Sequence, residues 1–139
     1  MTSTRPKKSS KPNGKSHPSG PHVVVVRVPI GRLTPHPRNS RKGNVEHIRL
    51  SLEEFGQYKP LVVQEATGHI LAGNHTYAAA QELGWTHIDV HYQDIDDTKA
   101  VRLALADNGT GDLAEWDISL LAKQLKEAGD GIPGFNLDY

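Results

Sequence analysis

Apolar residues recur along the chain with two different spacings, and these spacings predict where strands and helices form. Segments that are β-branched, or that alternate apolar with polar positions, predict strands at residues 23–30 (VVVVRVPI), 59–65, 69–73 and 87–93. Segments with apolar residues three or four positions apart predict helices at residues 45–56, 74–83, 96–108 and 118–128. Residues 31–44 are rich in proline and arginine, and we expect them to form a loop.

The order of these segments predicts the architecture of the protein. A strand, a helix, a hairpin, a helix and a strand are followed by two helices, which predicts an α+β fold with a small mixed sheet. The expected organisation is a disordered basic tail at residues 1–22, an α/β core at residues 23–95 and a C-terminal helical extension at residues 96–139. A length of 139 residues suits one domain.

The first 22 residues differ from the rest of the chain in composition. They hold five bases and no acid, and their only large apolar residue is Met1, so they cannot bury enough surface to offset the entropy of ordering. The chain has 16 bases and 16 acids in total, so residues 23–139 carry 11 bases against 16 acids, a net charge of −5. The tail is either a solubilising leader or an arm that binds nucleic-acid phosphates. The lysines of such an arm are Lys7, Lys8, Lys11 and Lys15.

Two further features of the composition exclude whole classes of protein. The chain has no cysteine, which excludes disulfides, thiolate nucleophiles, zinc–thiolate sites and iron–sulfur clusters. The tail lacks the apolar central region of a signal peptide, and no apolar run approaches the roughly 20 residues that span a bilayer. We therefore expect a cytoplasmic protein without a membrane partner.

The segment HILAGNHTYAAAQELG, residues 69–84, places polar side chains where a strand turns into a helix. A helix N-terminus exposes unpaired N–H groups and a partial positive charge, and both attract anions. Gly73 would let a ligand approach the backbone, while Asn74, His75 and Thr76 supply hydrogen-bonding side chains. The pattern fits a phosphate pocket. It also fits an ordinary helix start in which Asn74 caps the helix and His75 faces solvent.

Several motifs together resemble the N-terminal domain of the ParB family, a fold shared with sulfiredoxin. The matching segments lie between about residue 28 and residue 121 and read HPRNSR, SLEEFG, KPLVV and AGNHTYAAA. They are similar, in order, to the family's loop of proline, asparagine and arginine, its Ser-Ile-x-x-x-Gly helix end, its Pro-Ile strand and its Gly-Glu-Arg-Arg box. At Gly73, His75, Tyr77 and Ala78 the box resembles the Gly-Cys-His-Arg-Tyr box of sulfiredoxin more closely. The resemblance implies a ParB/sulfiredoxin-like domain, a type also labelled ParB-like nuclease.

The same resemblance implies a nucleotide site. In the family this box binds phosphates, those of CTP in chromosome-partitioning members and those of ATP in sulfiredoxin. A later family motif falls at Asp107 and Asn108, whose oxygens suit Mg²⁺ held near the phosphates. The residues that the resemblance assigns beside the nucleotide are Arg38, Asn39, Arg41, Gly73, Asn74, His75 and Thr76. The implied partners are a nucleotide and DNA, and a homodimer is left open.

The departures from the family pattern limit what the resemblance implies. Asn74 stands where sulfiredoxin has its cysteine, which excludes reduction of a sulfinic acid. Thr76 and Gly111 stand where the family has arginines, so two bidentate phosphate contacts are missing. Because the sequence ends at Tyr139, we expect a stand-alone member of phage or plasmid type rather than a complete partition factor.

Three functions stay open on the sequence alone. The first is a nucleotide-binding domain that uses CTP or ATP with Mg²⁺ in a DNA-associated role. Slow hydrolysis of the nucleotide stays open, and no residue is assigned to it. The second is a metal-dependent nuclease, although helix capping is the simpler account of the acids at residues 94–97. Its candidate acids are Glu53, Glu54, Asp94, Asp96 and Asp97. The third is a non-catalytic DNA-associated adaptor whose pocket has decayed and whose Trp116 helix meets a partner.

Overall fold

The computed structural model describes residues 20–37 and 45–135. Its elements, in chain order, are β1 (Val26–Pro29), the 3₁₀ helix η1 (Ile30–Arg32), β2 (Thr34–Pro35), α1 (Val45–Phe55), β3 (Leu61–Gln64), β4 (His69–Ala72), α2 (Asn74–Glu82), β5 (His87–Gln93), α3 (Asp97–Asp112) and α4 (Ile118–Ala128). None of the described helices is both long and apolar enough to cross a membrane.

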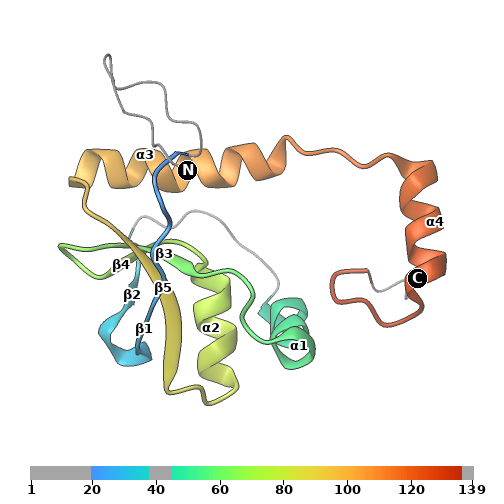
Figure 1. The fold of residues 1–139 in the computed structure, drawn as a ribbon, viewed down its shortest axis with the longest axis horizontal. Helices are drawn as coiled ribbons and strands as arrows, with labels where there is room; N and C mark the ends of the chain where they lie inside the picture. The colour runs from blue at the N-terminus through green and yellow to red at the C-terminus, as the bar shows by residue number, and fades with distance from the viewer. Residues whose placement is uncertain (1–19, 38–44, 136–139) are drawn as a thin grey trace, which may run out of the picture.

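One mixed sheet of five strands organises the fold, with the strand order β1-β5-β3-β4-β2 (Figure 1). β5 pairs antiparallel with β1 and parallel with β3, while β4 pairs antiparallel with β3 and parallel with β2. β1 and β2 are separated only by η1 and one residue, yet they form opposite edges of the sheet. The combination of parallel and antiparallel pairs with helices confirms the predicted α+β class.

The helices differ in how closely they contact the sheet. α1 packs against α2, which contacts β3, and α3 packs against β4. α4 lies apart from these elements, beyond the far end of α3 (Figure 1), and none of its residues is buried. α3 and α4 each begin after an aspartate whose side chain caps the helix. Asp96 accepts a hydrogen bond from the Lys99 N–H at 2.8 Å, and Asp117 accepts one from the Leu120 N–H at 3.1 Å.

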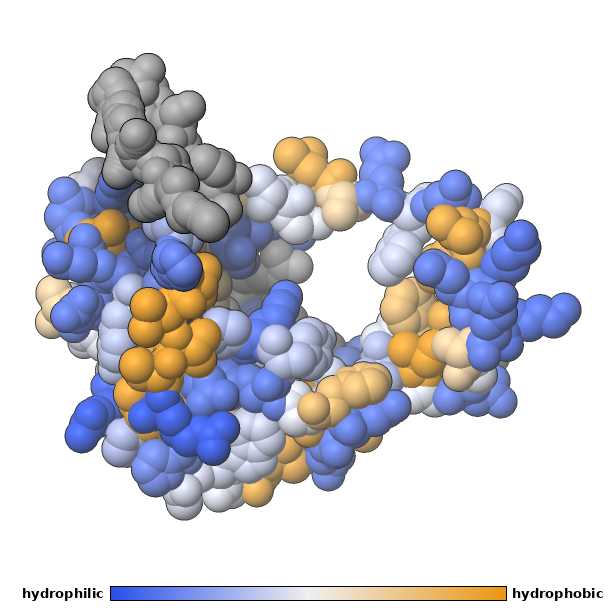
Figure 2. All heavy atoms as spheres, viewed as in Figure 1, coloured by the Kyte–Doolittle hydropathy of each residue, from blue (hydrophilic) through white to orange (hydrophobic). Residues whose placement is uncertain are grey.

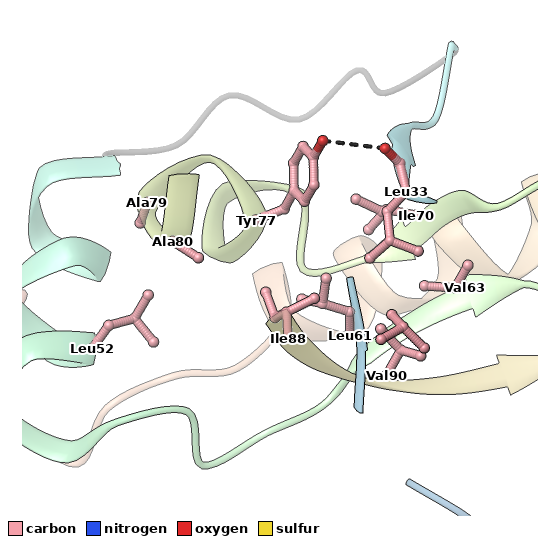
Figure 3. Close-up of a cluster of buried hydrophobic side chains, with 11 residues drawn as sticks. Leu33, Leu52, Leu61, Val63, Ile70, Tyr77, Ala79, Ala80, Ile88 and Val90 are labelled. Carbon is pink, nitrogen blue, oxygen red and sulfur yellow. Dashed lines mark hydrogen bonds between the residues drawn. The ribbon is translucent and has the colours of Figure 1, made fainter. Parts of the chain in front are cut away.

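The core lies between the central strands and the two packed helices (Figure 3). Ala79 and Ala80 on α2 are fully buried, and their small side chains let this helix approach the sheet closely. The Tyr77 hydroxyl donates a hydrogen bond to the Leu33 carbonyl at 3.1 Å, so α2 is also fixed to the segment before β2. The most deeply buried strand residues are Leu61, Val63, Ile70, Ile88 and Val90.

The first strand is shorter than predicted. It begins at Val26 rather than at residue 23, because pairing with β5 ends where Val26 meets Val90. Beyond that point the His91 ring, through Nδ1, contacts the Val24 carbonyl at 3.0 Å. Val23 and Val24 are therefore 66% and 63% exposed. Figure 2 shows the hydrophobic patch that this stretch contributes over β1.

Two further segments differ from the prediction by more than one or two residues. The expected loop at residues 31–44 contains β2, which forms because β4 offers an unpaired edge and the Thr34 N–H can donate to the Gly68 carbonyl at 3.1 Å. The helix predicted at residues 96–108 runs on to Asp112, through two glycines. In this last turn the Thr110 hydroxyl donates back to the Ala106 carbonyl at 2.9 Å.

Candidate functional site

The N-terminus of α2 lies at the end of β4 and has no side-chain cap. Gly73 occupies the N-cap position with φ +98° and ψ +21°. The first bond of the helix joins the Tyr77 N–H to the Gly73 carbonyl at 2.9 Å. The N–H groups of residues 74–76 therefore precede the regular hydrogen bonding of the helix, and they share its partial positive charge.

The interpretation of Asn74 as a helix cap is wrong. Asn74 is the first residue of α2, and its Nδ2 donates to the Ile70 carbonyl of β4 at 3.2 Å. Its Oδ1 accepts a hydrogen bond from the His36 N–H at 3.4 Å. The Asn74 amide thus connects the end of β2 to β4, and it is not available to the N–H groups of α2.

Gly73 is required by the fold itself. A Cβ at this position would lie 2.5 Å from Cδ2 of Leu61, a side chain that is 1% exposed in the core. The positive φ angle independently disfavours any side chain. The missing Cβ would have pointed toward the core, so close approach of a ligand is not needed to explain this glycine.

The α2 N-terminus opens into a cavity of about 560 Å³ between β4, α2 and α3. His75 and Thr76 line it from α2, and Asp107 and Asn108 line it from α3. The structure therefore brings together two groups of predicted residues that lie more than 30 positions apart in the sequence. The other lining residues are His36, Ile48, Lys59, Leu71, Ala72, Gly73, Asn74, Val101, Ala104, Leu105 and Gly111.

Two polar residues of the cavity were not predicted, His36 and Lys59. β3 runs antiparallel to β4, so the residue before β3 lies at the same end of the sheet as the residues after β4. The hairpin predicted from residues 59–65 and 69–73 already places Lys59 near Gly73. The predicted residues outside the described ranges are Arg38, Asn39, Arg41, Lys7, Lys8, Lys11 and Lys15.

Three of the five acids considered for a nuclease, Glu53, Asp96 and Asp97, make contacts that belong to the fold. Asp97 accepts a hydrogen bond at 3.0 Å from Nε2 of Gln64, which is itself buried. Glu53 forms an ion pair with Arg49 at 3.3 Å. The pKa of Arg49 is raised, first by its hydrogen bond to Glu46 and then by the charge of that carboxylate. Across residues 20–37 and 45–135, no three acidic or histidine side chains gather in a way that could hold a metal ion.

The histidines of β5 face the polar side of the sheet. His87 and His91 share that side with Asp89, which forms an ion pair with Arg27 of β1 at 2.9 Å. The His91 ring also contacts the Gln93 amide at 2.8 Å. The polar residues of β5 are therefore explained by contacts with β1 and with neighbouring residues of the strand.

Comparison with known proteins identifies relatives of about two thirds of the chain. Residues 15–109 match the family model of the ParB N-terminal domain. The chromosome-partitioning protein Spo0J of Thermus thermophilus is 32% identical over 90 residues, which cover 60% of this chain and 34% of that protein. The chain therefore spans about a third of the length of this relative.

A solved ParB structure has the same fold. The C-terminally truncated chromosome-partitioning protein ParB from Caulobacter crescentus, complexed with CTP-gamma-S, aligns with a TM-score of 0.59 and 22% identity over 68% of this chain and 57% of that chain. Sulfiredoxin from Arabidopsis thaliana aligns with a TM-score of 0.48 and 22% identity over 59% of this chain and 97% of that chain. The alignment with the Caulobacter crescentus structure confirms the fold predicted from the motifs.

Proposed function

Because this chain belongs to the ParB N-terminal domain family, we propose that it binds a nucleoside triphosphate, CTP or ATP, in the cavity at the N-terminus of α2. The main observation in support is an uncapped helix N-terminus that opens into a cavity of about 560 Å³. That volume lies within the range of small-molecule sites. The ParB structure from Caulobacter crescentus is complexed with CTP-gamma-S, which supports a nucleotide as the ligand class.

The phosphates would lie against the first turn of α2. The N–H groups of Asn74, His75 and Thr76 precede the regular helical hydrogen bonds, so they are free of helical partners and suited to donate to an anion. The Thr76 hydroxyl and the His75 imidazole add side-chain donors from the same turn. This arrangement uses backbone donors where other family members use arginines, so we expect weaker binding than a bidentate guanidinium would give.

Mg²⁺ fits the residues that α3 contributes to the cavity. Asp107 and Asn108 supply a carboxylate and an amide oxygen from adjacent positions, and both oxygen types are ligands that Mg²⁺ prefers. Mg²⁺ commonly uses one or two protein oxygens and takes the remainder from phosphates and water. When bound, the ion would neutralise part of the phosphate charge.

The DNA-associated role rests on the basic tail and on the kind of relative that the chain matches. Residues 23–139 are acidic overall, with 11 bases against 16 acids. Attraction to DNA would therefore come chiefly from the tail lysines at residues 7, 8, 11 and 15. We propose that Arg38, Asn39 and Arg41 flank the nucleotide, as the family resemblance implies.

The function that we propose is nucleotide binding; hydrolysis is a separate property and is not part of the proposal. Hydrolysis needs a positioned water and stabilisation of the developing charge. Among the described residues that line the cavity, Asp107 carries the one carboxylate, and the proposal already gives it to Mg²⁺. A nuclease is not proposed, because Asp96, Asp97 and Glu53 form the helix cap, hydrogen bond and ion pair described above.

The test is calorimetric titration of the full chain with CTP, ATP and GTP, in the presence of Mg²⁺ and again with EDTA. We expect one nucleotide to bind and His75→Ala to weaken it about tenfold, the loss of one hydrogen bond to a charged group. His87→Ala, on the polar side of the sheet, is the matched control and should bind as the unmodified protein does. Asp107→Ala should remove the difference between Mg²⁺ and EDTA.

Circular dichroism of each variant separates loss of binding from loss of fold. A folded, unmodified protein that binds none of the three nucleotides would contradict the proposal and leave the α2 N-terminus as a structural helix start. Inorganic phosphate release, measured on the same samples, reports hydrolysis independently of affinity.

A further inference from the structure

The backbone of Lys59, at the edge of the candidate site, is fixed in place by hydrogen bonds of Gln57. The Lys59 carbonyl accepts a hydrogen bond from Nε2 of Gln57 at 3.1 Å. The same Gln57 amide group donates to the Asp89 carbonyl at 2.9 Å and accepts from the Asp89 N–H at 2.8 Å. The short segment before β3 is therefore fixed to β5, while the Lys59 side chain remains exposed.

The position of Lys59 is unusual because it lies between two cavities. Together with Ile48 and Thr76 it lines the candidate nucleotide cavity. The same three residues line a neighbouring cavity of about 320 Å³, to which α1 contributes His47 and Ser51. Because Thr76 and Lys59 line both cavities, a phosphate chain that starts at the α2 N-terminus and extends past Thr76 runs toward Lys59.

The charge balance of the site favours a phosphate at Lys59. In the described ranges, Lys59 is the one lysine or arginine that lines the larger cavity, and no salt bridge within those ranges includes it. Thr76 and Gly111 take the places of family arginines, so a further cation beside the proposed Arg38, Arg41 and Mg²⁺ would replace part of the lost phosphate contacts. An ammonium on a flexible stem is a common phosphate-binding group.

We propose that Lys59 binds the terminal phosphate of the nucleoside triphosphate and so makes the site selective for triphosphates over monophosphates. This inference rests on the proposed function, since it assumes that the cavity holds a nucleotide. Gln57 is a positioning residue: it acts by fixing the backbone from which the Lys59 side chain extends.

The experiment compares affinities for CTP with CMP, and for ATP with AMP, by calorimetry on the full chain. Lys59→Ala should weaken triphosphate binding about 10- to 100-fold, the range for one hydrogen bond between charged groups. Monophosphate binding should change less than about threefold, because that ligand does not reach the ammonium. Lys59→Arg should keep most of the affinity for the triphosphate. Lys123→Ala, an exposed lysine on α4, is the matched control and should have no effect.

The outcomes separate this inference from the function on which it rests. If the unmodified protein binds a triphosphate and Lys59→Ala binds it equally well, Lys59 has no role and the nucleotide site stands. Equal weakening of triphosphate and monophosphate would place Lys59 elsewhere on the ligand and overturn selectivity for the terminal phosphate. If the unmodified, folded protein binds none of the four nucleotides, both proposals fail together.

Discussion

Replacing Gly73 by alanine tests the structural role of the turn that begins α2. The new Cβ would lie 2.5 Å from Cδ2 of Leu61, well inside van der Waals contact, and the residue would keep a φ near +98°. A left-handed conformation costs alanine about 1–2 kcal/mol, and forcing extra volume into a packed core costs about 1–3 kcal/mol. We therefore expect Gly73→Ala to lower the free energy of unfolding by about 2–5 kcal/mol.

Gly84 provides the matched control for this change. It also has a positive φ, +79°, but a Cβ built there meets no atom within 4 Å. Gly84→Ala should therefore cost only the conformational term, about 1–2 kcal/mol. The difference between the two variants measures the clash with Leu61, free of the backbone strain that they share.

Urea unfolding followed by circular dichroism measures both variants, since a change of midpoint without a change of slope reports stability. Leu61→Val removes the clashing carbon, so Gly73→Ala should cost only about 1–2 kcal/mol in that background. If Gly73→Ala and Gly84→Ala are equally destabilising, or if Leu61→Val gives no relief, the steric explanation of this glycine is refuted.

Three further changes test other parts of the structure. Tyr77→Phe leaves the buried Leu33 carbonyl without its donor and should cost about 1–2 kcal/mol in urea unfolding. Gln64→Met removes a buried amide that donates to Asp97 and to the Ile95 carbonyl, and the same measurement should show a loss of about 2–3 kcal/mol. Asp117→Ala removes the cap of α4 and should weaken that helix by about 1 kcal/mol, seen as faster amide exchange in α4 alone; protection that is unchanged there would contradict the capping role.

The spacing of apolar residues predicted most elements, because the face that each helix or strand buries is set by residues close together in the sequence. The strand predicted at residues 87–93 is β5, and the helix predicted at residues 118–128 is α4, each without a boundary error. The extension of α3 through Gly109 and Gly111 ran against propensity, since each glycine weakens a helix by about 1 kcal/mol. The division of the chain after residues 22 and 95 stays a prediction.

The site was only partly accessible from the sequence. Motif resemblance grouped residues 73–76 with Asp107 and Asn108, and these residues line one cavity. His36 was missed because its position depends on the pairing of β2 with β4, which periodicity does not contain. Lys59 was missed although the predicted hairpin already placed it near Gly73. The alternative in which Asn74 caps α2 is wrong because the Asn74 amide bonds to His36, 38 residues away, a contact that local sequence does not contain.

The pairing of β1 with β5 has a consequence for the protein during its synthesis. Arg27 pairs with Asp89, 62 residues later in the chain, so the first strand cannot enter the sheet until the ribosome has made the fifth. At about 5–20 residues per second, that delay is about 3–12 seconds. Throughout this interval β1, Val26–Pro29, has no native partner strand to pair with, and the three exposed valines at residues 23–25 extend its apolar run. The nascent chain therefore carries its first strand unpaired until the last strand of the sheet has been made, so the rate of translation sets how long this apolar segment stays without its partner.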